Sequence, residues 1–321
     1  MNKNVLTNWG RLLSLMFSSV IFSLPYILWT LYVPMQTALN VDNEKLGFIM
    51  TIYGAVAIPS YLFGGFIADK INPTKLIAFS LFGVGLLGFY YATIPSYNMV
   101  LVIQFFMALL SIGCYFPALI KATRFISDNF GQSLGFGALE GGRKLSYFVF
   151  NAMFIYAFSR FGEGVSGFKA ALFTISVQCI VMGIIVFFVF RGVDYNKMAV
   201  REGDKVELSK VVPLLKKPAV WLIALTILLV YVSSTVQGYV TSYLVNIFGM
   251  GEAQSAWFFS FTQFAAPLIV ILGGWLTDKA GIEKGMLISQ VLLVITIIGL
   301  LAAPTGPAYL VPAMVSLLIF L

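Results

Sequence analysis

The feature that most constrains this chain is a series of apolar runs, each about 20 residues long or longer. A helix needs about 20 apolar residues to cross about 30 Å of hydrocarbon. Such runs are too long for the alternating strands of a membrane barrel. The chain is therefore predicted to be an all-α polytopic membrane protein. The expected spans are 12–36, 46–68, 75–95, 99–121, 134–158, 169–190, 218–246, 254–277 and 285–304, and a tenth, incomplete, begins near Ala308.

The composition supports a membrane chain and excludes several classes of function. Hydrophobic residues make up 60% of the chain and charged residues 10%, against about 45–50% and about 25% in soluble domains. His is absent, which argues against zinc, haem and imidazole chemistry. Cys114 and Cys179 lie inside apolar runs and are interpreted as buried small hydrophobes. No metal site and no cofactor are predicted.

The basic residues predict an orientation in the membrane. With the N-terminus inside, the inner segments hold 15 of the 20 Lys and Arg residues and the outer loops hold 3. This bias predicts a multi-pass protein of the cytoplasmic (inner) membrane with a cytoplasmic N-terminus. The net charge of +7 falls in loops without a basic face, so no nucleic-acid partner is expected.

One long polar stretch divides the chain. Residues 191–217 carry seven Lys and Arg residues and are expected to form a cytoplasmic linker. Residues 1–190 are expected to form an N-terminal six-helix half. Residues 218–321 are expected to form a partial C-terminal half with helices 7 to 10, the last incomplete.

A short motif occurs once in each part. Residues 64–70 (GGFIADK) precede Lys75, and residues 273–279 (GGWLTDK) precede Lys284, at a constant offset of 209. Glycines let helices approach closely, and an Asp at the membrane edge can face a helix N-terminus or a cation of a neighbouring helix. A plain charged turn beside a glycine contact is the alternative. The expected gating residues are Gly65, Asp69, Lys70, Gly274, Asp278 and Lys279.

The repeated motif resembles the loop signature of the major facilitator superfamily. The resemblance covers the whole chain and implies two pseudo-symmetric six-helix halves, related as a parallel repeat. On it, about two and a half helices are expected to be missing, and the chain is expected to be a fragment or a truncated product.

A closer likeness is to the organophosphate:phosphate antiporters, which include sugar-phosphate permeases. It lies in residues 47–73 and 257–279. The helix 1 and helix 7 positions that carry Arg in those antiporters fall on Tyr26 and Ser233, so an anion carrier built on this chain needs another cation. Residues 135–143 (GFGALEGGR) resemble organic-anion-like bacterial members of the same superfamily.

The resemblance implies a solute site between the halves, lined by helices 1, 4, 7 and 10. Polar and aromatic residues recur at helical spacing on the first three. Such stripes also serve as packing contacts in membrane helices, so both interpretations stay open. The candidate substrate-binding residues are Tyr26, Trp29, Val33, Gln36, Gln104, Ser111, Tyr115, Arg143, Ser233 (or Ser234), Gln237 and Thr241.

Helix 5 holds a cluster of charges deep in a predicted span. Glu140, Arg143 and Lys144 fall about 9–15 Å past its start, at about 1.5 Å per residue. Burial of a charge there costs about 2.5–3.5 kcal/mol, and Glu140 can pair with either cation at i+3 or i+4. The cluster is either a self-satisfied structural or gate element, or an anion site anchored by Arg143. Glu140, expected to be buried, is also the candidate for proton coupling.

The sequence lacks the residue sets of enzymes and ATP-driven pumps. We find no nucleophile–base pair, metal site or acid pair and no Walker motif, so an enzyme is not expected. The expected function is secondary transport by alternating access of a small organic anion or sugar-type solute, as a symporter or antiporter. A transporter-like sensor or other non-transporting membrane protein is the alternative. The expected partners are the solute, a coupling ion (proton, sodium or counter-anion) and the bilayer, with the chain a monomer.

Overall fold

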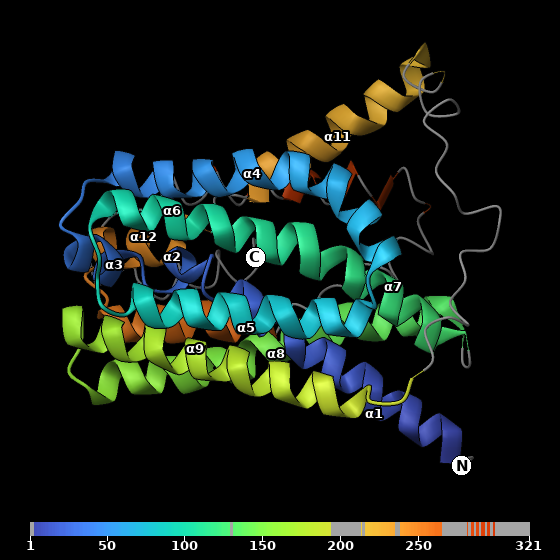
Figure 1. Cartoon of the computed structure of the whole chain (residues 1–321). Coiled ribbons are helices and arrows are strands. Elements are labelled where there is room, and N and C mark those ends of the chain that lie inside the picture. Colours follow the sequence, from blue (N-terminus) through green and yellow to red (C-terminus); the bar gives the residue numbers. More distant parts are fainter. Residues whose placement is uncertain are drawn as a thin grey trace.

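The computed structural model describes residues 3–128, 131–193, 213, 216–234 and 238–264, with scattered positions between 281 and 298. Every regular element in these residues is a helix. Most of the long helices run side by side, and the N-terminus lies at one end of the bundle (Figure 1). We call residues 3–193 the first bundle and residues 216–264 the second group.

The first bundle contains the five spans expected between residues 46 and 190. Each corresponds to one helical stretch, and only the ends differ by a few residues. The elements are α1 (Lys3–Ser18), the 3-10 helix η1 (Ser19–Phe22), α2 (Ile27–Thr30), α3 (Tyr32–Leu39), α4 (Asn43–Lys70), α5 (Pro73–Tyr91), α6 (Tyr97–Ala108), the π-helix η2 (Leu109–Tyr115), α7 (Phe116–Ser127), α8 (Gln132–Arg160) and α9 (Gly164–Val189).

N-cap side chains mark the residues at which α4 and α5 begin. Asp42 precedes α4, and its side chain accepts the backbone N–H of Lys45 at 2.8 Å. Asn72 precedes α5 in the same way, accepting the N–H of Thr74, with Pro73 in the first turn. Short polar acceptors and an N-terminal proline are the usual signals for a helix start. They allow the sharp turn that reverses the chain after α4.

The first expected span, 12–36, is not one continuous helix. The chain runs from α1 through η1, turns at residues 23–26, and continues as the short helices α2 and α3. Pro25 and Pro34 lack the N–H that a continuous helix needs. The carbonyl oxygen of Pro25 instead accepts a hydrogen bond from Nε2 of Gln104, at 3.0 Å. The prediction of an unbroken helix 1 is therefore wrong.

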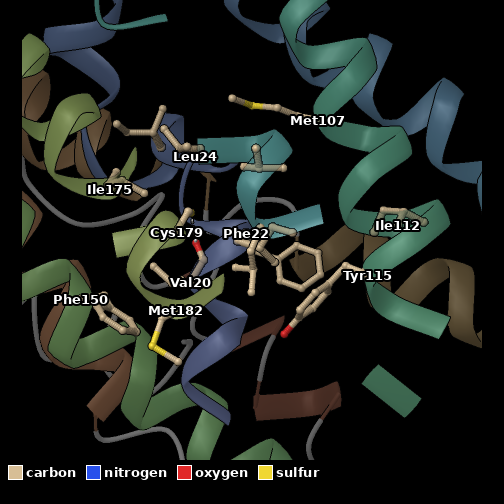
Figure 2. Close-up of a cluster of buried hydrophobic side chains, with 14 of the residues drawn as sticks. Val20, Phe22, Leu24, Met107, Ile112, Tyr115, Phe150, Ile175, Cys179 and Met182 are labelled. Atoms are coloured by element: carbon tan, nitrogen blue, oxygen red, sulfur yellow. Dashed lines mark hydrogen bonds between the residues drawn. The ribbon is translucent and has the colours of Figure 1, made fainter. Parts of the chain in front are cut away.

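The broken segment lies at the centre of the hydrophobic core. Val20, Phe22 and Leu24 lie between Met107, Ile112 and Tyr115 on one side and Phe150, Ile175, Cys179 and Met182 on the other (Figure 2). Cys179 is fully buried, as expected, whereas Cys114 is only half-buried; both thiols are free. The core fixes the position of helix 1 against both sides of the bundle.

The second group packs on the first bundle at one end and also beside α8. It contains α11 (Pro218–Ser234), α12 (Val240–Phe248) and helical residues 252–264. The expected span 218–246 is thus divided between two helices. α12 contacts α2 and α3, while α11 leans away from the bundle (Figure 1). Most of the span 285–304 and the second motif copy lie outside the described residues.

Few of the described helices meet a strict test for a membrane span on length and composition alone. Pro73–Tyr91, Tyr97–Ser127 and Gly164–Val189 meet it, and the two bent parts of α4 together make a fourth. Helix 1 is broken into short pieces, α8 carries three charges in its middle, and α11 has 17 residues. Among the described residues this number is below the nine expected, because apolar runs alone ignore breaks and charges and because parts of 254–277 and 285–304 lie outside those residues.

Candidate functional site

A cavity of about 540 Å³ lies between the first bundle and the second group. Helix 1, α4, η2, α7, α8 and residues 252–264 all contribute to its walls. The lining residues are Phe22, Ser23, Tyr26, Trp29, Thr30, Tyr61, Ile112, Phe116, Glu140, Arg143, Lys144, Tyr147, Asn151, Phe259 and Gln263.

One face of α8 supplies the polar wall of this cavity. Glu140, Lys144, Tyr147 and Asn151 recur at helical spacing, with Arg143 beside them, and all five line the cavity. Residues three and four apart lie on the same helix face. The sequence analysis identified the three charged residues and missed Tyr147 and Asn151. The spacing that continues from Glu140 along the span was the signal.

Arg143 is held by two contacts from different helices. Its Nη1 donates to Oε1 of Glu140 at 2.8 Å, and its guanidinium carbon lies 5.6 Å from the centroid of the Phe22 ring. A cation over an aromatic face at this distance is stabilised by the ring quadrupole. The Nε atom is buried and has no hydrogen-bond partner. Arg143 is thus fixed in place with donor capacity to spare.

Glu140 is more open to solvent than its partner. Its side chain is 61% exposed, against 15% for Arg143. The expectation that this carboxylate is buried is therefore wrong. The position is deep in the apolar run, but the side chain lies in the wall of the cavity.

Lys144 reaches from the first bundle to the second group. Its Nζ donates to Oε1 of Gln263 at 3.1 Å. The rings of Phe148 and Phe264 also pack together, with centroids 5.1 Å apart and planes tilted by 44°. A polar and an aromatic contact therefore join the two parts at the level of the cavity.

The opposite wall is aromatic and includes two predicted residues. Tyr26 and Trp29 line the cavity with ring centroids 4.7 Å apart. The centroid of the Tyr53 ring lies 5.2 Å from that of the Tyr26 ring. Among the predicted substrate-binding residues, the structure thus brings Tyr26, Trp29 and Arg143 together around one cavity.

The predicted helix 4 stripe lies within the protein and does not line the cavity. Gln104, Ser111 and Tyr115 are buried. The Ser111 hydroxyl lies 2.8 Å from that of Tyr53 on α4, and the Tyr115 hydroxyl lies 2.8 Å from that of Ser18 on α1. Together with the bond from Gln104 to helix 1, these contacts join helices.

The remaining candidates lie near the end where the two parts meet. Gln36 donates to Oδ1 of Asn43 at 2.9 Å, and Thr241 donates to the carbonyl of Trp29 at 3.2 Å. Val33 packs against the core. The side chains of Ser233, Ser234 and Gln237 lie outside the described residues.

Residues 252–264, in the predicted span 254–277, contribute side chains that the sequence analysis did not consider. Phe259 and Gln263 line the cavity from residues 252–264, and Tyr61 and Phe116 complete its walls. Gln263 is a polar residue in the middle of an apolar run. A search of the predicted span 254–277 for polar and aromatic residues at helical spacing, as on helices 1, 4 and 7, would have found it.

The described copy of the repeated motif joins helices of the first bundle. Asp69 pairs with Lys121 of α7, and a Cβ atom on Gly64 would lie 2.5 Å from the carbonyl oxygen of Gly113 in η2. Gly65 has open space around it, and Lys70 is exposed. Gly274, Asp278 and Lys279 lie outside the described residues.

The two parts also meet at one end of the bundle. Gly238 packs against Trp29, where a Cβ atom would lie 2.7 Å from Nε1. The rings of Tyr32 and Tyr239 lie 5.8 Å apart. This end is the predicted outer side, because it holds the loops between α3 and α4 and between α5 and α6.

Comparison with curated proteins relates the chain to bacterial membrane proteins. It is 28% identical over 306 residues to the inner membrane protein YqcE of Escherichia coli K12, covering 94% of this chain and 72% of that protein. It is 29% identical over 272 residues to the inner membrane protein YihN of the same organism, covering 81% and 62%. These relatives support a multi-pass inner-membrane protein.

Solved structures with the same fold are membrane transporters. The nucleoside transporter NupG matches with a TM-score of 0.75 and 14% identity, over 99% of this chain and 78% of that one. An inward-facing, unoccupied bacterial homolog of the human lysosomal transporter Spinster matches with a TM-score of 0.72 and 14% identity, over 100% and 73%. Identity this low shows the fold alone.

The sequence profile described as the Major Facilitator Superfamily matches residues 12–321. This match and the structural neighbours confirm the predicted all-α facilitator fold and agree with the expectation of a transporter rather than an enzyme. The chain belongs to the Major Facilitator Superfamily.

Proposed function

We propose that this protein is a secondary active transporter that moves a small organic anion through the cavity by alternating access. The observation that supports this most is the charge of the cavity wall. Among the described residues, Glu140, Arg143 and Lys144 line the cavity and sum to one positive charge. Burial of an unbalanced charge costs several kcal/mol, and a bound anion would offset that cost.

Arg143 has the geometry of an anion anchor. Contacts with Glu140 and Phe22 already restrict its rotamer, so less entropy is lost when a ligand binds. A guanidinium presents a planar fork of donors that suits carboxylate, phosphate or sulfonate groups. We propose that it orients the anionic group of the solute.

The aromatic wall supports an organic solute over a bare inorganic ion. Phe22, Tyr26 and Trp29 line the same cavity, and aromatic rings pack against the C–H groups of a sugar or the plane of an aromatic ring. The volume of about 540 Å³ falls within the usual range for small-molecule sites, about 300–1,000 Å³. A sugar-type or other ring-bearing organic anion fits both properties.

The likeness to organophosphate:phosphate antiporters extends to the location of the site and departs in its cation. Tyr26, at the helix 1 position that carries Arg in those antiporters, lines the cavity. We propose that α8 supplies the cation here instead. A proton, sodium or a counter-anion drives the transport, with the N-terminus in the cytoplasm.

The test uses purified full-length protein in proteoliposomes. Trp29 lies in the cavity wall, so binding of an anion should change tryptophan fluorescence, and Trp29→Phe should remove most of that change. A panel of labelled organic anions, with neutral analogues as controls, should show uptake against an ion gradient. Uptake of neutral analogues alone would overturn the anion assignment. Binding without uptake would favour a sensor.

A further inference from the structure

We infer that Lys144 supplies the unbalanced positive charge of the cavity, and that the site therefore selects anions with a single negative charge, which Lys144 and Gln263 hold from the two sides. This inference rests on the proposed anion transport. It assigns the charge of the transported anion and adds Lys144 as a second residue that binds it. Arg143 retains its orienting role.

The pairing of the three charges assigns the excess to Lys144. Arg143 and Glu140 lie on adjacent turns and form an ion pair at 2.8 Å, so their charges offset one another. The hydrogen bond of the Lys144 ammonium among the described residues goes to Gln263, and an amide carries no charge. Among the residues that the structure describes, the wall thus consists of one neutralised pair and one ammonium that lacks a counter-charge.

The partner of Lys144 occupies the position of an anionic oxygen. Oε1 of Gln263 lies 3.1 Å from Nζ, a normal hydrogen-bond distance. An ammonium has three donors, and this bond uses one, so a carboxylate oxygen can bind beside Gln263. The NH₂ group of Gln263 can donate to the same ligand. One anion would then contact both parts of the molecule.

The other polar groups that the structure describes in this cavity are neutral. Asn151 and Ser23 line the same cavity, and the buried hydroxyl of Ser23 has no hydrogen-bond partner. Such groups suit the hydroxyl or carbonyl oxygens of a solute. They do not neutralise a second negative charge, and an unpaired buried charge is strongly disfavoured. A dianion is therefore the poorer ligand.

A tethered carboxylate tests this assignment without knowledge of the substrate. Gln263→Glu places an anion on the atom that now accepts from Lys144. The apparent midpoint of thermal unfolding in detergent should rise by about 2–5 °C, and Lys144→Gln in the same chain should abolish the rise. Gln254→Glu, an exposed change on the same helix, is the matched control. An unchanged or lower midpoint for Gln263→Glu, with Gln254→Glu neutral, would overturn the inference.

Free ligands test the valence. Gluconate, glucarate and glucose share one carbon skeleton and carry one, two and no negative charges; benzoate and phthalate provide a second pair. Any bound monoanion should bind at least tenfold more tightly than its dianion, and Lys144→Gln should weaken it at least tenfold while Lys144→Arg retains part of the affinity. A preference for the dianion would refute the inference. Failure of every organic anion in the wider screen would instead refute the proposed function, and the tethered carboxylate would still report on Lys144.

Discussion

Lys121 of α7 contacts two consecutive residues at the end of α4. Its Nζ lies 3.1 Å from Oδ1 of Asp69 and 2.9 Å from the carbonyl oxygen of Ala68. The Asp of the repeated motif therefore holds two helices of the first bundle together and makes no contact with the described second group. Its role in gating would be to keep these helix ends moving as one body.

Asp69→Asn should reduce turnover far more than solute binding. The Asp69 side chain is 58% exposed, and an ion pair this open contributes about 0–1 kcal/mol, so the fold should persist. Transport rates and equilibrium binding, measured on the same preparation, separate the two effects. Asp128→Asn is the matched control, because Asp128 accepts a hydrogen bond from Gln132 near the same end of the bundle. Equal turnover in both variants would mean that Asp69 has no role in transport beyond its place in the turn.

Adjacent glycines of the motif should differ sharply in their tolerance of a methyl group. Gly64→Ala places a Cβ atom 2.5 Å from the Gly113 carbonyl oxygen and 2.8 Å from the Pro117 ring, whereas Gly65→Ala meets no atom within 4 Å. Overpacking of this kind costs about 1–3 kcal/mol. Thermal unfolding in detergent should show a lower midpoint for Gly64→Ala alone, and equal midpoints would contradict the close approach of α4 and η2.

The contact between Gly238 and Trp29 should control the opening of that end of the molecule. Gly238→Ala puts a Cβ atom 2.7 Å from Nε1 of Trp29, so the partly buried indole ring and the added methyl group must move apart. The variant should favour the state in which this end is open, detected as faster thiol labelling at Ser242→Cys. Gly47→Ala serves as the control, since its Cβ atom would lie 4.0 Å from the Tyr239 hydroxyl. Unaltered labelling would mean that the contact does not limit opening.

The same end should close more firmly as the pH falls. Glu252 lies before residues 254–277, outside the predicted span, and partial burial and then the nearby Glu163 raise its pKa above the ordinary 4.5. A raised pKa means that this conformation binds a proton more tightly than one in which Glu252 is solvated. Closure is therefore favoured as the pH falls through the raised pKa, and this gain is lost above it. The labelling rate is divided by that of a free thiol at the same pH, because only the thiolate reacts. This ratio should be independent of pH in this window for Glu252→Gln.

Labelling from each side of the membrane tests the orientation. The positive-inside bias predicts that Asn98→Cys, at an exposed position near the start of α6, reacts with an impermeant reagent outside. Lys205→Cys in the predicted linker should react only after the membrane is opened. Cys114→Ala and Cys179→Ala remove the native thiols. Reaction at position 205 from outside would reverse the topology, and the contact between Trp29 and Gly238 would then lie on the cytoplasmic side.

Most of the helical framework of the first bundle was predictable from the apolar runs in the sequence alone. The expected span 134–158 falls within Gln132–Arg160 and 169–190 overlaps Gly164–Val189, because long apolar runs offer no other way to satisfy their backbone in lipid. Helix 1 was mispredicted because a hydropathy run does not register Pro25 as a break. The π-helical turn had no signal in hydropathy at all.

Apart from Tyr26 and Trp29, which the family resemblance indicated, the site was predictable only where a charge marked it. Arg143 and Lys144 stand out in an apolar run, and both line the cavity. Gln104 and Gln263 look alike in sequence, yet one joins two helices of the first bundle and the other faces the cavity. The difference depends on how the two parts pack, which no spacing within one helix encodes.

The π-helical turn from Leu109 to Tyr115 has a consequence for the whole length of its helix. A turn of this kind contains one residue more than the α-helix around it, and each residue rotates the chain by about 100° at 3.6 residues per turn. The extra residue therefore sets the angular phase of everything that follows. Without it, α7 would present a different side to α4, and Lys121 would no longer face Asp69. The ion pair at the end of the helix thus depends on a winding irregularity one and a half turns or more earlier in the chain.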